Sequence, residues 1–146
     1  RHSHEYDMPG NGILFEPLRH STGPYNRASY IGLTGLFTRN AAAGFVKIRY
    51  YGVSSLFIER FTVVTDGKTY QSPPIDFETD NASKVREWVN LRLDDPEVRA
   101  LVERIIHSNK AVIRFQGRHY HQDLLVPDRM KSDMRAMLKA IDLINQ

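Results

Sequence analysis

The sequence contains no cysteine. This absence excludes disulfide bonds, thiolate zinc sites and a cysteine nucleophile, but it fits both reducing and oxidising compartments. The chain also lacks any apolar run close to the roughly 20 residues that a membrane-spanning helix requires. No stretch has the charged and then apolar layout of a secretory signal. The sequence therefore predicts no membrane span.

The excess of positive over negative charge is also small. Twenty lysine and arginine residues stand against 17 aspartate and glutamate residues, and acids interrupt the basic stretches, as in Arg86-Glu87. A small excess of this kind gives only a mild attraction to anionic partners, and there is no basic stripe of the type that a phosphate backbone requires. Residues 47–51 alone interleave basic and aromatic side chains, so a nucleic-acid-binding sheet is kept as an alternative that we do not favour.

The length of 146 residues and the hydrophobic share of 41% suit one globular domain with a full core. Residues 1–27 are rich in proline, glycine, histidine and serine, and we interpret them as an extended N-terminal arm with one short edge strand. Residues 28–146 show no internal boundary and are expected to form a single domain. The chain begins with Arg1 and not with methionine, which we attribute to removal of a signal peptide or to a segment added for expression. We slightly favour a periplasmic or secreted location over the cytoplasm.

The first half of the domain has the composition and alternation of β-strands. Strands are predicted over residues 29–37, 45–51 and 56–65, the last as a central strand because both of its faces are mostly apolar. Asp66-Gly67 indicates a type I′ turn, whose two central residues need positive φ. Residues 68–72 should return alongside, with Tyr70 opposite Val63.

Helical spacing appears in the second half. A first helix is predicted over residues 83–93, with Val85, Trp88 and Val89 on its buried stripe. A second begins with Asp95 as N-cap and Pro96 at the first helical position. A third follows residue 128 and carries a methionine stripe that we interpret as core. We therefore expect a single α+β domain: a mostly antiparallel sheet of five to six strands, with three helices in the C-terminal half covering one face.

Between the last two helices, residues 111–126 predict a β-hairpin with the densest group of reactive side chains in the chain. We place a two-residue type II′ turn at Gly117-Arg118, which pairs Phe115 with Tyr120 and Arg114 with His121. Side-chain alternation then divides the hairpin into two faces. The expected buried face contains Ile113, Phe115, Tyr120 and Leu124, and the expected exposed face contains Arg114, Gln116, His119, His121 and Asp123.

The hairpin is the best candidate site, because arginine, tyrosine and histidine bind through both area and hydrogen bonds. An alternative use is metal binding by His119, His121 and Asp123, since His-x-His on a strand presents two imidazoles to one ion. A further ligand would be needed, and His20 in the arm is the available histidine. A third alternative gives this face no binding role: it is solvated, and its polar side chains discourage edge-to-edge pairing with another sheet. The candidate binding residues are Arg114, Arg118, His119, Tyr120, His121 and Asp123.

A search for catalytic patterns finds no Gly-x-Ser-x-Gly elbow and no histidine with an identifiable partner. His107-Ser108 lies at a predicted helix end, and Asp76, Glu78 and Asp80 alternate in an extended segment that we expect to face water. We therefore hypothesise a non-enzymatic binding or accessory module, of the kind that bacteria export, which contacts a protein partner through the hairpin and needs no cofactor. The alternatives are a metal-binding protein or metal-dependent hydrolase built on the two hairpin histidines and Asp123, and the nucleic-acid-binding sheet.

Overall fold

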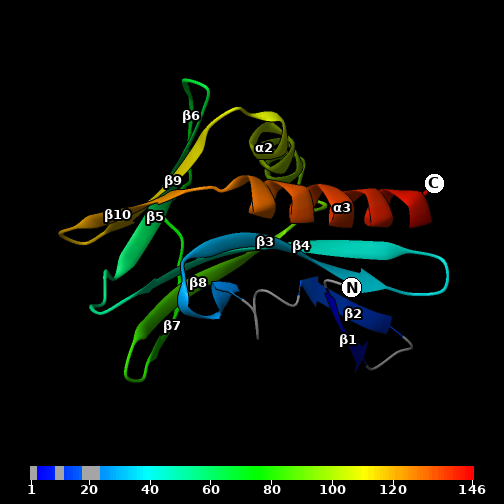
Figure 1. Cartoon of the computed structure of the whole chain (residues 1–146), viewed down its shortest axis with the longest axis horizontal. Helices are drawn as coiled ribbons and strands as arrows, with labels where there is room; N and C mark the ends of the chain where they lie inside the picture. The colour runs from blue at the N-terminus through cyan, green and yellow to red at the C-terminus, as the bar shows by residue number, and fades with distance from the viewer. Residues whose placement is uncertain (1–2, 9–11, 18–23) are drawn as a thin grey trace.

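Two antiparallel sheets and two α-helices make up a single α+β domain. The computed structural model describes residues 3–8, 12–17 and 24–146. The larger sheet has six strands, is strongly curled, and has the order β1-β2-β3-β4-β8-β7; the smaller has four, in the order β10-β9-β5-β6 (Figure 1). The elements are β1 (Ser3–Met8), β2 (Gly12–Pro17), the 3₁₀ helix η1 (Pro24–Arg27), β3 (Tyr30–Phe37), β4 (Ala42–Gly52), β5 (Ile58–Thr65), β6 (Lys68–Gln71), β7 (Glu78–Asn81), β8 (Val85–Arg92), α2 (Pro96–His107), β9 (Ala111–Gly117), β10 (His121–Leu125) and α3 (Asp128–Ile144).

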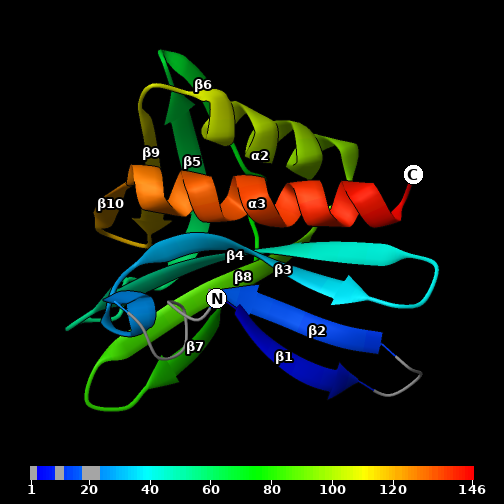
Figure 2. The same cartoon turned by 45° about the vertical axis from the view of Figure 1, so that its right-hand side comes forward.

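The long helix α3 packs across the inner face of the six-stranded sheet, and α2 lies beside it on the side of the four-stranded sheet (Figure 2). The inner face is apolar at every second position, as at Leu33, Val46 and Ile48, which are all buried. Gly35 on β3 permits the close approach of α3, because a β-carbon there would lie 2.9 Å from the sulfur of Met137. No helix in the described part of the chain is long and apolar enough to cross a membrane.

Several local predictions are confirmed. Asp66 and Gly67 have φ values of 48° and 85°, and Tyr70 lies opposite Val63. At the start of α2 the Asp95 carboxylate accepts a hydrogen bond from the Glu97 N–H at 2.9 Å. The buried residues of this helix recur with helical spacing, at Val98, Leu101, Val102, Ile105 and Ile106. These features depend on residues close together in sequence, which is why the pattern alone predicts them.

The helix predicted over residues 83–93 is wrong: this segment forms strand β8, so the described residues contain two α-helices and not three. Val85, Glu87 and Val89 point inward with a period of two. Trp88 lies half-buried on the opposite face, with the Lys47 ammonium 5.2 Å from its ring. Glu87, an acid at an inward position, interrupts the apolar alternation of the strand. The apolar residues that remain, Val85, Trp88 and Val89, have the i, i+3, i+4 spacing of a helix.

The expectation of one sheet is also wrong. Strand β5, predicted to be central, is an inner strand of the separate four-stranded sheet. In the segment predicted to be an extended arm, β1 and β2 pair with each other and β2 pairs with β3, so two strands stand where one was expected. Residues 9–11 and His20 of this segment lie outside the described residues.

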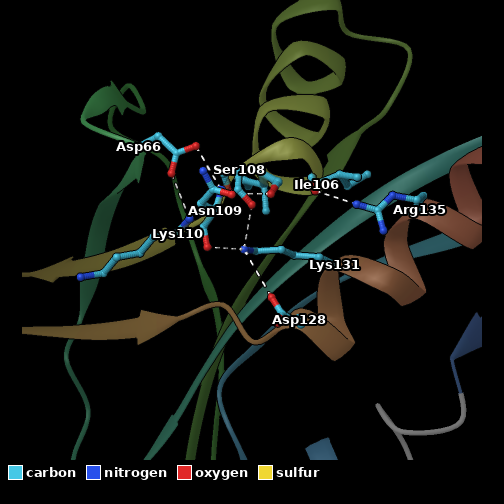
Figure 3. Close-up of polar contacts among 9 residues, drawn as sticks. Asp66, Ile106, Ser108, Asn109, Lys110, Asp128, Lys131 and Arg135 are labelled. Carbon is cyan, nitrogen blue, oxygen red and sulfur yellow. Dashed lines mark hydrogen bonds and ion pairs between the residues drawn. The ribbon is translucent and has the colours of Figure 1, made fainter.

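Polar contacts join the end of α2 to α3 (Figure 3). The Lys131 ammonium, on a residue only 4% exposed, donates to the carbonyl oxygens of Ser108 at 3.1 Å and Asn109 at 3.4 Å. Arg135 donates to the carbonyl oxygen of Ile106 at 2.9 Å. The last carbonyls of a helix have no partner within the helix and carry partial negative charge, so cations at this end are stabilising.

Asp66, in the turn between β5 and β6, also binds the segment that follows α2. Its carboxylate oxygens accept hydrogen bonds from the N–H groups of Asn109 and Lys110, both at 3.0 Å (Figure 3). These two bonds, with that from Asn109 the larger effect, lower the pKa of Asp66. The β5–β6 turn is thereby tied to the segment between α2 and β9.

Asp66→Asn should lower the melting temperature at pH 7, because the amide keeps one acceptor oxygen of two while asparagine still tolerates positive φ. A carboxyl with a lowered folded-state pKa stabilises above its unfolded pKa, about 3.9, and this stability is lost as the pH falls through the folded pKa. Thermal unfolding of both proteins from pH 7 to pH 2 should show the two melting temperatures converging at the acid end. Asp80→Asn, at an exposed position in β7, is the control. A difference that persists unchanged into acid would contradict the role of the carboxylate.

Candidate functional site

A carboxylate buried inside the domain organises the most unusual region of the structure. Glu87, only 1% exposed, points inward from β8 and accepts hydrogen bonds from the N–H groups of Leu56 at 2.6 Å and Ile58 at 2.9 Å. Tyr50 lies opposite Glu87 on β4, and burial, with a smaller effect from this carboxylate, raises the pKa of the Tyr50 phenol. A buried carboxylate requires donors of this kind. The contact links the six-stranded sheet to the first residues of β5 in the four-stranded sheet.

Phe57 lies between the two N–H donors and has a strained backbone. Its φ of 55° is in the left-handed region, which bulky residues rarely occupy and which costs roughly 1–2 kcal/mol. The Phe57 side chain points outward from this segment. The residue is 56% exposed, although phenylalanine usually stabilises a fold by being buried.

The β9–β10 loop packs against this segment. Position 117 has no room for a side chain, because a β-carbon there would overlap the carbonyl oxygen of Leu56. The next residue, Arg118, donates its N–H to that same oxygen at 3.2 Å and places its guanidinium carbon 5.3 Å from the centre of the Phe57 ring. This is the distance of a cation–π contact. Close approach of the two backbones therefore positions Arg118 over Phe57.

A hollow of about 580 Å³ adjoins the exposed ring. Its size falls within the range of ligand sites. The register between β5 and β9 shifts between Ile58 and Arg60, as it does at a β-bulge. The N–H of Ile75 donates to the Glu59 carbonyl oxygen at 2.9 Å, which holds residue 75 beside this shift. The lining residues are Phe57, Ile58, Glu59, Arg60, Pro74, Ile75, Asp76, Phe77, Thr79, Glu87 and Arg118.

The hairpin exists as predicted, but its turn and register differ. His121 pairs with Gln116 and not with Arg114, and the N–H of Gly117 donates to the Tyr120 carbonyl oxygen at 2.8 Å. Among the described glycines only Gly67 has positive φ, so the type II′ turn is wrong. Gly117 is required for its closeness to Leu56 and not for a turn conformation.

A register shift of two residues leaves most side chains on the faces predicted for them. Ile113 and Phe115 are buried, and Leu124 is half-buried. Tyr120 is the exception: it lies in the loop and is 74% exposed, so its assignment to the core is wrong. Arg118, His119 and Tyr120 form the loop, and His121 and Asp123 lie on the outward face of β10.

The predicted outward face contains an ion pair. Arg114 Nε and Nη2 donate to the two carboxylate oxygens of Asp123 at 2.8 and 3.0 Å. These hydrogen bonds raise the pKa of Arg114 and lower that of Asp123. Nowhere in residues 3–8, 12–17 and 24–146 do three histidine, aspartate or glutamate side chains group closely enough to hold a metal ion. The geometry therefore gives no support to a metal site on His119, His121 and Asp123.

The alternative of base stacking on residues 47–51 gains no support either. Tyr50 is buried and its hydroxyl donates to the Ser54 carbonyl oxygen at 3.0 Å. The Tyr51 ring has the Arg86 guanidinium 5.1 Å from its centre. A stacking platform needs free ring faces, whereas here the Tyr50 ring is buried and cations of the same chain lie over the Tyr51 ring.

Three residues of the site were missed in the sequence: Phe57, Arg60 and Glu87. A signal existed only for Glu87, because an acid at an inward position of a strand of alternating residues marks a buried carboxylate once the strand is recognised. Phe57 has no local signal, since the contact beside it, from the Leu56 N–H to Glu87, joins residues 31 positions apart in the sequence.

Comparison with known protein families, curated proteins and solved structures yielded no match for this chain. The function must therefore be argued from the geometry of the site.

Glu87→Ala should lower the free energy of unfolding by about 3 kcal/mol, because each buried N–H left without an acceptor costs roughly 1–3 kcal/mol. Glu87→Gln retains one acceptor oxygen and should lose about half of that. Urea unfolding measures both. Glu78→Ala, at an exposed position of the neighbouring strand β7, is the matched control and should change stability by less than about 0.5 kcal/mol. Equal effects at the two positions would disprove the role of Glu87.

The strain at Phe57 can be measured separately from its ring. Phe57→Gly and Phe57→Ala both remove the ring, but only glycine relieves the positive φ, so the glycine variant should be more stable by about 1 kcal/mol. At Val64, an exposed position of β5 with ordinary φ, the order should reverse, with alanine more stable by about 0.5 kcal/mol. Chemical denaturation of the four variants tests both orders. Alanine proving the more stable at position 57 would show that the backbone is not strained there.

Proposed function

We propose that the protein is a non-enzymatic binding module, which contacts a protein partner through the Phe57 surface. This surface comprises Phe57, Arg118, Tyr120 and the adjoining hollow. The observation that carries the proposal is the exposed aromatic ring on a strained backbone. Neither the exposure nor the positive φ stabilises the fold, and strain of this kind concentrates at binding sites.

The composition of the surface supports the proposal. Aromatic residues and arginine are enriched at the centres of protein interfaces, where they act as anchors. Phe57 and Tyr120 are among the most exposed large side chains in the described part of the chain, and Arg118 lies over the Phe57 ring. Arg118, His119 and Tyr120 belong to the hairpin chosen from the sequence as the binding element. His121 and Asp123 lie beyond the loop, at the margin of this surface.

Photo-crosslinking tests the proposal directly. A benzophenone amino acid at position 57 replaces one aromatic side chain by another, and in cells that express the protein at its native level it should give one discrete adduct. The same group at Leu143, which is exposed on α3 away from the site, is the matched control and should not give that adduct. Adding Arg118→Glu should reduce the adduct at position 57 at least about tenfold, the effect of losing about 1.4 kcal/mol of binding.

Thermal unfolding must show that each of these variants is folded. No adduct at position 57, or the same adducts at positions 57 and 143, would refute the proposal.

A further inference from the structure

The hollow beside Phe57 contains two arginines without acidic partners. Within residues 3–8, 12–17 and 24–146, the side chains of Arg60 and Arg118 make no hydrogen bond or ion pair, and the Arg118 guanidinium lies over the Phe57 ring in cation–π geometry. Other arginines of the chain are paired, for example Arg99 with Asp142 at 2.6 Å and Arg114 with Asp123 at 2.8 Å. Ion pairing is thus available to this chain and is not used in the hollow.

Charges of both signs line the hollow. Arg60 is half-buried, whereas Glu59 and Asp76 are exposed to solvent. The third carboxylate, that of Glu87, already accepts two backbone hydrogen bonds. A partly desolvated guanidinium without a partner is unfavourable, and a carboxylate that forms paired hydrogen bonds with it removes that cost. Arg60 and Arg118 are therefore the groups of the hollow that suit an anionic partner, beside carboxylates that face solvent or already accept hydrogen bonds.

Apolar surface surrounds the same cations. Ile75 and Phe77 are half-buried, and the Phe57 ring is exposed beside them. An occupant that used the whole hollow would place an apolar side chain against these residues and an acidic one near the arginines. Charge complementarity thus distinguishes this surface from a purely apolar groove.

We propose, on the basis of the protein-binding function above, that the Phe57 surface recognises an acidic segment of a protein partner in which carboxylates alternate with aliphatic or aromatic side chains. The carboxylates interact with Arg60 and Arg118. The apolar side chains pack against Phe57, Ile75 and Phe77.

Titration with three matched peptides, followed by ¹H–¹⁵N NMR, tests the charge preference. The probes are acetyl-Leu-Glu-Leu-Glu-Leu-amide and its Gln and Lys counterparts. The Glu peptide should shift the amides of Phe57, Arg60 and Arg118 and bind at least about tenfold more tightly than the Gln peptide, and added salt should weaken it. The double variant Arg60→Glu/Arg118→Glu should instead prefer the Lys peptide.

Arg39→Glu/Arg129→Glu is the matched control, because it changes the net charge equally at two exposed arginines outside the hollow. It should retain the preference for the Glu peptide. Arg118→Glu alone, at an exposed loop position, provides the same test if the double variant is unfolded. Equal binding of the Glu and Gln peptides, preference of the native protein for the Lys peptide, or no shifts in the hollow would overturn the acidic preference. A crosslink at position 57 in those cases would leave the protein-binding function standing, whereas its absence would refute that function as well.

Discussion

The two hydrogen bonds that Glu87 accepts from Leu56 and Ile58 connect the two sheets of the domain. Strand β8 belongs to one sheet and β5 to the other, and these bonds join them at a point that no β-ladder links. Burial makes the contact obligatory on both sides, since a carboxylate without donors and N–H groups without an acceptor are each costly in a dry environment. The start of β5 therefore cannot move independently of β8.

The exposed ring lies beside this constraint. Phe57, between the two residues whose N–H groups bind Glu87, has positive φ, and its side chain faces solvent. Because residue 117 is glycine, the β9–β10 loop approaches Leu56 closely enough for the Arg118 N–H to donate to the Leu56 carbonyl oxygen. The Arg118 guanidinium then lies over the Phe57 ring. A ring held in this way is already ordered in the folded protein, so it loses little conformational entropy when a partner binds.

The sequence predicted what short-range chemistry determines. The Asp66-Gly67 turn and the Asp95 cap each depend on neighbouring residues, and both were predicted correctly. Strand β8 was not predicted, because Glu87 occupies an inward position, where it binds the segment that leads into the other sheet. The hairpin register failed for a similar reason: Gly117 serves a close approach to Leu56, which local turn preferences do not describe.

Some failures of the sequence pattern involve residues of the candidate site. Glu87 violates the apolar alternation of its strand, Phe57 violates the rule that phenylalanine is buried, and Gly117 is a glycine without positive φ. Each departure weakens local preference, and each is explained by one junction between strands that are remote in sequence. Conflicts between local preference and tertiary structure are expected at functional or strained sites. That these departures coincide at one surface is the physical argument for proposing the function there.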